Sequence, residues 1–225
     1  MAIGERRRTI FITGATGYLG QALVPELLSR GHFVRALIRS GSARKLPPGC
    51  AVVIGDALDG ESFAGQVAPS DTLVHLVGVS HPAPWKAAEF ERVDLASVRA
   101  SIAAARAGGV SHVVYLSVAQ PAPVMRSYQA ARAEAERLIG VSGIAATFVR
   151  PWYVLGPGHR WPYALVPLYA ALEAFPPTRQ GARRLGLVRR PEMTAALVWA
   201  VEHPPSGVRL MPVEAIRTPT LLAVA

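Results

Sequence analysis

A chain of 225 residues with a hydrophobic fraction of 51% can form one large α/β domain with a small appendage. It contains no run of about 18 uninterrupted apolar residues, so we expect no membrane span. The formal net charge of +9 could indicate a nucleic-acid partner, but the basic residues are scattered. We therefore expect a solvated basic surface that attracts an anionic cofactor, and no nucleic acid.

Apolar segments alternate with segments of helical periodicity, which predicts an α/β fold with a doubly wound parallel sheet of the Rossmann type. Most strand segments are continuous apolar runs, as expected for strands that are covered on both faces. The predicted strands are 9–13, 33–38, 51–54, 71–77, 112–116 and 145–150. The predicted helices are 17–30, 59–67, 89–108 and 127–141. Pro25 lies inside the first helix, where it should kink the helix or remove a hydrogen bond.

Prolines and aromatic residues become dense after residue 150. A helix over 162–175, a strand over 184–188, a helix over 191–203 and a strand over 207–213 are predicted there. We interpret 1–150 as a dinucleotide-binding Rossmann core. The segment 151–225 is interpreted as a small C-terminal substrate cap on the same domain, over the strand ends where open α/β sheets bind ligands.

The single cysteine, Cys50, excludes an internal disulfide and suits a reducing cytoplasm. The charged segment before Thr9 lacks the apolar region of a signal peptide, so we expect a cytoplasmic protein. Neither His81 nor His159 has metal-ligand spacing to another ligand residue, so no metal is expected. The common hydrolase and kinase motifs are missing from the sequence.

A glycine-rich turn lies between the first predicted strand and the first predicted helix, with Gly14, Gly17 and Gly20 at a G-x-x-G-x-x-G spacing. Without a Cβ, backbone N–H groups and a helix N-terminus can approach a pyrophosphate closely. The alternative is a purely structural turn, because a glycine triad alone is a weak signal. We expect the following turn residues to bind a dinucleotide: Gly14, Thr16, Gly17, Tyr18, Leu19 and Gly20.

The residue after the second predicted strand distinguishes between the two nicotinamide cofactors. Arg39 stands there, and no Asp or Glu occurs between His32 and Gly55. An acidic residue would bond the ribose 2′-hydroxyl, whereas an arginine pairs with a 2′-phosphate, so NADP(H) is favoured over NAD(H). Asp56 follows the third strand. It could accept from the adenine amino group or cap the next helix, and the sequence favours neither interpretation.

Several motifs occur in a fixed order along the chain. They are Gly14-x-x-Gly17-x-x-Gly20, Gly55-Asp56-Ala57-Leu58-Asp59, Val74-His75-Leu76-Val77-Gly78, Tyr115-Leu116-Ser117, Tyr128-x-x-x-Arg132 and Arg150-Pro151-x-x-Val154-x-Gly156-Pro157. In this order they resemble the short-chain dehydrogenase/reductase superfamily. The resemblance is to its extended and atypical branch of NAD-dependent epimerase/dehydratase-like and NAD(P)H-binding proteins, and it covers nearly the whole chain.

The resemblance implies a role for each matching residue. The glycines would line the pyrophosphate, Asp56 and the adjacent Ala57 would meet the adenine, and Val77 and Gly78 would border the adenosine ribose. Pro151 is also expected at the cofactor. Ser117 would orient the substrate carbonyl or hydroxyl, and Tyr128 would be the general acid/base.

Arg132 departs from the resemblance, because lysine usually stands four residues after the tyrosine. Residues 128 and 132 lie one turn apart on one helix face, so the cation could lower the tyrosine pKa and bond the ribose. Arginine does not release its protons and cannot join a proton relay as lysine can. The departure leaves two hypotheses open: that catalysis is retained, or that only cofactor binding is.

We expect a partly apolar substrate pocket from His81, Trp85, Trp152, Tyr153 and Trp161. The hypothesis that we favour is an NADP(H)-dependent oxidoreductase acting on a carbonyl or hydroxyl of a small-molecule substrate. The alternative is a non-catalytic NAD(P)H-binding sensor or assembly module. A sugar-nucleotide epimerase or dehydratase ranks lower, because the short C-terminal part leaves little to grip a nucleoside diphosphate. A monomer and a homodimer fit equally well.

Overall fold

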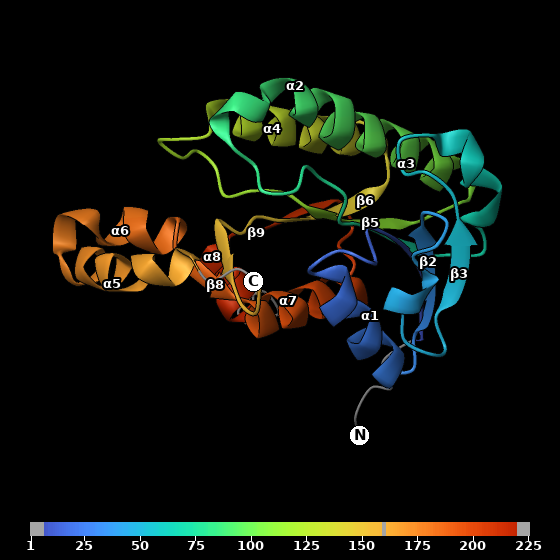
Figure 1. Cartoon of the computed structure of the whole chain (residues 1–225), viewed down its shortest axis with the longest axis horizontal. Helices are drawn as coiled ribbons and strands as arrows, with labels where there is room; N and C mark the ends of the chain where they lie inside the picture. The colour runs from blue at the N-terminus through green and yellow to red at the C-terminus, as the bar shows by residue number, and fades with distance from the viewer. Residues whose placement is uncertain (1–6, 159–160, 220–225) are drawn as a thin grey trace.

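The computed structural model describes residues 7–158 and 161–219, and the side chains of Trp161 and Pro162 lie outside that description. A seven-stranded parallel sheet runs through the molecule in the order β3-β2-β1-β4-β5-β6-β9 (Figure 1). Its strands are β1 Thr9–Thr13, β2 Phe33–Ile38, β3 Ala51–Ile54, β4 Thr72–His75, β5 His112–Leu116, β6 Ala145–Val149 and β9 Val208–Met211. The predicted doubly wound sheet is confirmed, and the strand order reverses beside β1 and β4, where such sheets bind ligands.

Helices cover both faces of the sheet (Figure 1). One layer contains α1 Gly20–Ser29, α7 Arg190–Glu202 and α8 Val213–Arg217. The other contains α2 Ala87–Glu89, the π-helical segment η5 Phe90–Leu95, α3 Ala96–Ala107 and α4 Arg126–Gly140. Short 3₁₀ turns occur at η1 Ala43–Lys45, η2 Gly60–Ser62, η3 Ala64–Gln66 and η4 Pro84–Lys86. Pro25 is exposed on α1, so its ring faces solvent.

Alternation along β1 divides the core into two hydrophobic clusters. Ile10 and Ile12 pack with α1 residues such as Leu23 in one cluster. Phe11 packs on the opposite face with residues such as Ile102 of α3. Because successive side chains of a strand point to opposite faces, a continuous apolar run fills both layers.

The helix predicted over 59–67 is wrong, because the structure has the two separate turns η2 and η3 there. Phe63 lies between them with φ −141°, and its buried ring stacks on Phe11 at a centroid distance of 5.9 Å. Gly60 and Gly65 also disfavour a continuous helix. Core packing of one aromatic ring therefore overrides the helical pattern.

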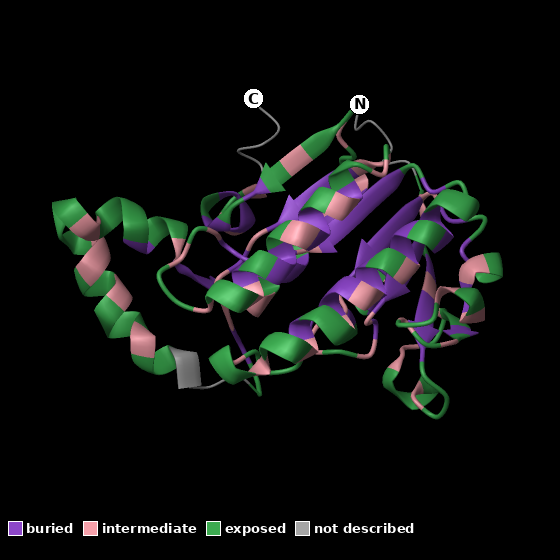
Figure 2. Ribbon diagram, turned by 90° about the horizontal axis from the view of Figure 1, so that it is seen from above, coloured by how far each residue is buried: buried purple, intermediate pink, exposed green. Residues whose placement is uncertain are grey.

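The region after β6 contains two elements that the sequence did not predict, a strand over 153–155 and a helix over 176–184, whereas the helix predicted over 162–175 corresponds to the 3₁₀ turn and helix over 161–174. β7 Tyr153–Leu155 and β8 Leu187–Arg189 form a small parallel pair. Between them lie η6 Trp161–Leu165, α5 Val166–Ala174 and α6 Pro176–Arg184, which project from the body as a helical hairpin (Figures 1 and 2). The strand predicted over 184–188 was placed too early, because α6 continues to Arg184. The helix and strand predicted over 191–203 and 207–213 correspond to α7 and β9.

Candidate functional site

A cavity of about 440 Å³ opens at the carboxyl ends of β1, β4, β5 and β6. It brings together residues from segments that are far apart in the sequence. Of the predicted site residues, it is lined by Gly14, Gly17, Tyr18, Leu19, Gly20, Gly78, His81, Ser117, Tyr128, Pro151, Trp152 and Tyr153. The glycine turn, the Ser117–Tyr128 pair and the aromatic residues after β6 therefore face one space.

At Gly14 and Gly20 the glycine turn is packed so tightly that side chains could not replace the hydrogens. Gly14 has φ +79°, and a Cβ there would lie 2.9 Å from the Leu76 carbonyl carbon. A Cβ at Gly20 would lie 2.4 Å from the Ala15 carbonyl oxygen. The Gly17 N–H donates to the Gly14 carbonyl at 3.0 Å, which closes the turn immediately before α1. The first N–H groups of a helix have no intrahelical acceptor, so this cradle fits the diphosphate of a dinucleotide.

Ser117 stands at the first position after β5, and its N–H donates to the Val149 carbonyl at 2.8 Å. Its side chain is buried, and its Oγ has no hydrogen-bond partner among the residues that the structure describes. Because buried hydroxyls are normally paired, an unpaired one in a cavity wall fits a ligand oxygen. Tyr128 reaches the same cavity from α4, and its ring lies 5.1 Å from that of Phe90.

Arg132 does not line the cavity and is only 3% exposed. Its guanidinium donates to the Leu116 carbonyl at 2.8 Å and to the Tyr115 hydroxyl at 3.1 Å. The guanidinium carbon lies 5.1 Å from the centroid of the Tyr128 ring. A Cβ at Gly78 would lie 2.2 Å from its Nη2, so Arg132 occupies the space directly behind Gly78. Arg132 therefore does not face the cavity itself. It can influence the cavity only through the lining residues that it contacts, Leu116, Tyr128 and Gly78.

Asp94 completes this buried network and was not predicted as a site residue. Its Oδ1 accepts from the Val79 N–H at 2.8 Å and lies 3.4 Å from Arg132 Nη2. Burial raises the pKa of the Asp94 carboxyl, while Arg132 and the Val79 N–H act in the opposite direction. Burial also raises the pKa of Tyr115 to about 12, so this phenol stays protonated at neutral pH.

Other predicted cofactor residues lie outside the cavity lining: Thr16, Arg39, Asp56, Ala57 and Val77. Arg39 is exposed directly after β2, and Asp56 is exposed two residues after β3. β2 lies next to β1 in the parallel sheet, and β3 lies next to β2. Arg39 and Asp56 therefore stand at the same carboxyl edge of the sheet as the glycine turn. Asp59, rather than Asp56, caps the following turn by accepting from the Glu61 N–H at 3.1 Å.

A second, adjacent cavity of about 290 Å³ is lined largely by apolar groups. Trp85 lies there together with Met125, and Tyr128, Trp152 and Tyr153 line both cavities. The rings of Trp152 and Tyr153 are 5.4 Å apart in an edge-on arrangement. The side chain of Trp161 and the whole of His159 lie outside the described residues.

Among the residues that the structure describes, no three His, Cys, Asp or Glu side chains gather in a way that could hold a metal ion. In the same ranges, every helix is too short or too polar to cross a bilayer.

A glycine cradle at the reversal point of a doubly wound parallel sheet defines a Rossmann-type dinucleotide-binding protein. The chain belongs to the NAD(P)H-binding family, whose model matches residues 14–164. The predicted superfamily resemblance is thereby confirmed.

Two curated relatives are reductases. A ceramide reductase of Caulobacter vibrioides is 28% identical over 208 residues, which cover 91% of this chain and 64% of the relative. A 4-hydroxy-2-methyl-3-oxo-4-farnesyl-3,4-dihydroquinoline-1-oxide ketoreductase of Stigmatella aurantiaca is 30% identical over 168 residues, which cover 65% and 50%. The chain thus spans about half to two thirds of the length of these relatives.

Solved structures share the fold at low identity. UDP-galactose 4-epimerase has a TM-score of 0.69 with 20% identity, covering 90% of this chain and 76% of that one. The Bordetella bronchiseptica enzyme WbmG, in complex with NAD and UDP, has a TM-score of 0.67 with 21% identity, covering 94% and 75%. At this identity the likeness concerns the fold alone.

Proposed function

We propose that this chain is an NADP(H)-dependent oxidoreductase that acts on a carbonyl or hydroxyl of a small, partly apolar substrate. The observation that carries the proposal is that the glycine cradle, Ser117 with its buried, unpaired Oγ, and Tyr128 all belong to residues that line one cavity. The two reductase relatives support the same reaction class. The apolar second cavity supports a substrate with an apolar part.

In this proposal Ser117 Oγ holds the substrate oxygen and the Tyr128 hydroxyl exchanges a proton with it. A nicotinamide cofactor held on the glycine cradle would supply the hydride chemistry. Arg132 is a positioning residue: it holds the Leu116 carbonyl next to Ser117 and lies against the Tyr128 ring. Residues from 151 onward, such as Trp152 and Tyr153, form the substrate-facing wall.

Single-turnover oxidation of NADPH over a panel of ketones, aldehydes and quinones tests the activity. Tyr128→Phe should lower the rate by roughly 10²–10⁴-fold, the usual contribution of a positioned acid/base, with NADPH affinity unchanged. Tight NADPH binding without turnover of any carbonyl, or turnover that ignores Tyr128→Phe, would overturn the proposal.

The positioning role of Arg132 has its own readout. Arg132→Lys keeps the charge but cannot reproduce the fork, in which Nη1 donates to the Leu116 carbonyl and the Tyr115 hydroxyl while Nη2 faces Asp94. It should lower kcat while KM for NADPH stays constant, because the segment that carries Ser117 loses part of its support. If Arg132 were merely structural, the variant would lose folded protein but keep its kcat per folded molecule.

The choice of NADP(H) depends on Arg39. It is exposed at the end of β2, and Arg44 and Lys45 are also exposed in the following segment. Arg39→Asp should reduce the preference for NADPH over NADH by about tenfold or more, because one charge-assisted phosphate contact is replaced by repulsion. An unchanged ratio of the two dissociation constants would remove the assignment.

The second candidate is a non-catalytic NAD(P)H-binding module. The specific observation in its favour is that Arg132, at the position where the superfamily resemblance implies lysine, is enclosed behind Gly78. The two candidates differ in the turnover assay above, since the module would bind NADPH and reduce nothing. A sugar-nucleotide epimerase ranks third, because its support is likeness of fold.

A further inference from the structure

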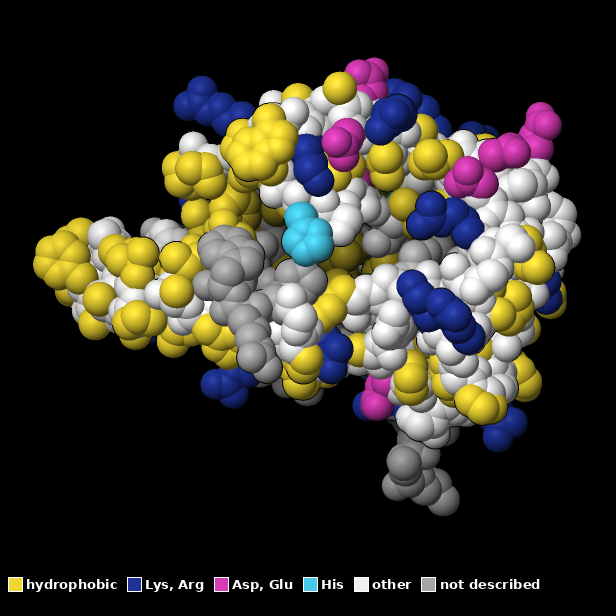
Figure 3. Space-filling view, in the orientation of Figure 1, with side chains coloured by type: hydrophobic (Ala, Val, Ile, Leu, Met, Phe, Trp, Pro, Cys, Tyr) yellow, Lys and Arg dark blue, Asp and Glu magenta, His cyan; other side chains and the backbone are white. Residues whose placement is uncertain are grey.

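The helical hairpin of residues 161–184, called the arm below, exposes apolar side chains that a stable fold would normally bury. None of the residues of α5 is buried. The large apolar residues that are exposed in the described part of the arm are Tyr163, Val166, Leu168 and Phe175, with exposed fractions of 41–60%. Figure 3 shows hydrophobic side chains covering the arm to its tip on the face in view. Helices that are apolar all round are usually buried in protein or lipid, so this surface is suited to a contact.

The charges of the arm are almost entirely positive. Its sequence contains three arginines and one acidic residue, Glu173. Arg179, Arg183 and Arg184 of α6 are exposed, while Glu173 lies 3.6 Å from Arg217, which offsets its charge. Arg179 also donates to the last carbonyls of α5, at 2.9 Å to Glu173 and 3.2 Å to Ala174. The arm therefore combines an apolar helix with an adjacent basic helix.

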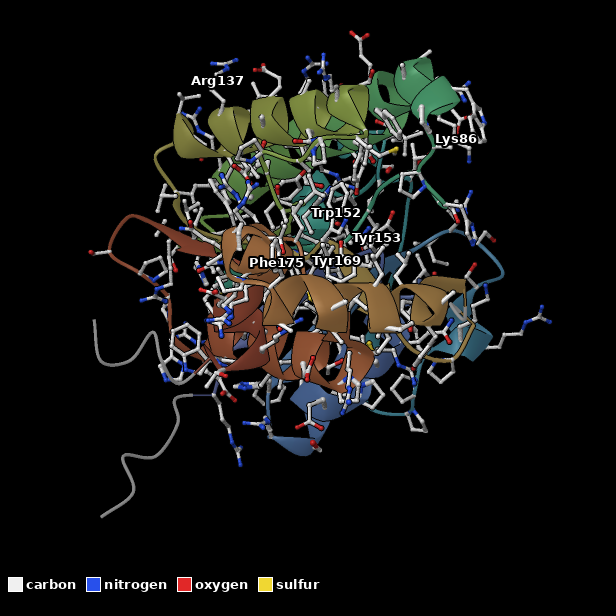
Figure 4. All side chains as sticks on the ribbon, turned by 90° about the vertical axis from the view of Figure 1, so that its left-hand side faces the viewer. Lys86, Arg137, Trp152, Tyr153, Tyr169 and Phe175 are labelled. Carbon is white, nitrogen blue, oxygen red and sulfur yellow. The ribbon has the colours of Figure 1, made fainter. Side chains whose placement is uncertain are left out.

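The arm is connected to the walls of the two cavities. Tyr169 of α5 shares a hydrogen bond with Trp152, a residue that lines both cavities. Figure 4 shows Trp152 and Tyr153 in the space above α5, with Tyr169 and Phe175 on the arm below them. A surface that covers the arm would thus lie next to the apolar cavity.

We propose that the arm docks on an anionic lipid bilayer, with α5 at the boundary between headgroups and acyl chains and the α6 arginines among the headgroups. Apolar and aromatic side chains next to arginines are the combination by which helices lie in a membrane interface. A second copy of this chain suits the arm less well. Two chains of net charge +9 repel each other, and each arm would present arginines to the other. The docking surface goes beyond the proposed reaction and does not depend on it.

Vesicle flotation tests the proposal with the full chain and two kinds of vesicle, phosphatidylcholine alone and phosphatidylcholine with phosphatidylglycerol. Binding should require phosphatidylglycerol and weaken with salt. Phe175→Glu and Leu168→Glu should each weaken binding on the order of tenfold, because a charge replaces a buried apolar group at the interface. Arg183→Gln should weaken it about fivefold, the usual effect of one basic residue near an anionic surface.

The matched control is Phe33→Glu, which makes the same change at a phenylalanine that is equally exposed, 60%, but lies at the start of β2. It should bind vesicles like the unchanged chain. NADPH affinity and circular dichroism of every variant keep a folding defect apart from a docking defect.

Failure to bind phosphatidylglycerol vesicles, or binding that the arm variants leave unchanged, overturns the proposal. So does self-association without lipid that Phe175→Glu abolishes in sedimentation experiments, since the occupant of the arm would then be a second copy. NADPH turnover without vesicles measures the proposed reaction separately.

Discussion

The helices α1 and α5 have similar lengths, 10 and 9 residues, and both contain mostly apolar residues, yet their surroundings are opposite. α1 buries Leu23, Val24 and Leu27 against the sheet, whereas α5 buries nothing. Composition alone therefore does not decide where an apolar helix lies. The free energy of folding comes from the layered core around the cofactor cradle, and the apolar surface of the arm remains available for an intermolecular contact.

The largest expected effect lies in the buried network behind the cavity. Asp94→Leu leaves the Arg132 guanidinium buried without its carboxylate and removes the acceptor of the Val79 N–H. Breaking one partner of a buried ion pair typically lowers the free energy of unfolding by about 3–5 kcal/mol. Urea denaturation followed by circular dichroism measures it.

The double variant Asp94→Leu/Arg132→Met removes both charges and should regain much of the lost stability. Glu134→Ala breaks the exposed pair with Arg137, 2.7 Å apart, and serves as the surface control with little change in the urea midpoint. If Asp94→Leu changed the urea midpoint as little as Glu134→Ala, the buried network behind the cavity would not stabilise the fold.

The next largest effect concerns the cradle. Gly17 lines the cavity, and a Cβ there would lie 3.1 Å from the Gly14 carbonyl oxygen with no other atom beyond its chain neighbours within 4 Å. Gly17→Val should weaken NADPH binding on the order of 100-fold, or ~2.7 kcal/mol, with a much smaller change in thermal stability. Gly65→Val is the control, because no atom lies within 4 Å of a Cβ at that exposed turn. Calorimetric titration measures the NADPH affinity of both variants. Equal affinities of Gly17→Val and Gly65→Val would contradict the prediction.

Lowering the pH should reduce the stability of the core before it affects the arm. Burial, with a contribution from Arg132, lowers the pKa of His75 to about 3, and its Nδ1 lies 2.9 Å from the Thr13 hydroxyl. In the unfolded chain, where a histidine has a pKa near 6.5, this residue binds a proton between about pH 6.5 and pH 3. In the folded protein it stays neutral over the same range. Stability therefore falls as pH falls through this window.

Between pH 7 and pH 5, His75 should remove about 2 kcal/mol of unfolding free energy, and His112, with a pKa lowered to about 4 chiefly by burial, about as much again. His75→Gln should shrink the difference between urea midpoints at the two pH values by its share. The arm contains no histidine, so its own unfolding should not follow this profile. An unchanged pH difference in His75→Gln would contradict the assignment.

The contrast between the layered core and the arm also explains which elements could be predicted from the sequence. Strands β1, β2, β3 and β5 have the predicted bounds, because burial on both faces demands an uninterrupted apolar run. The helix α6 was missed because Pro176 and Pro177 indicate a break, although proline fits the first turn of a helix. Where tertiary packing does not constrain a segment, as in the arm, the local pattern is ambiguous.

The site shows a similar division. Gly14, Ser117 and Tyr128 were predicted from motifs, and they line one cavity. Asp94 was not, because 38 residues separate it from Arg132 and no local spacing joins them. Whether a cation at position 132 faces a ligand or turns away depends on the space behind Gly78, which only the three-dimensional arrangement reveals.

The smallest expected effect is the sharpest test of the comparison between core and arm. Phe175→Ser removes an exposed ring and should change the free energy of unfolding by less than about 0.5 kcal/mol. The same change at Phe63, which is 1% exposed and stacked on Phe11, should cost about 3–5 kcal/mol, because it leaves a cavity in the core. Parallel urea titrations of the two variants measure both. If Phe175→Ser were as destabilising as Phe63→Ser, the arm would be part of the folding core, and its apolar surface would need no partner.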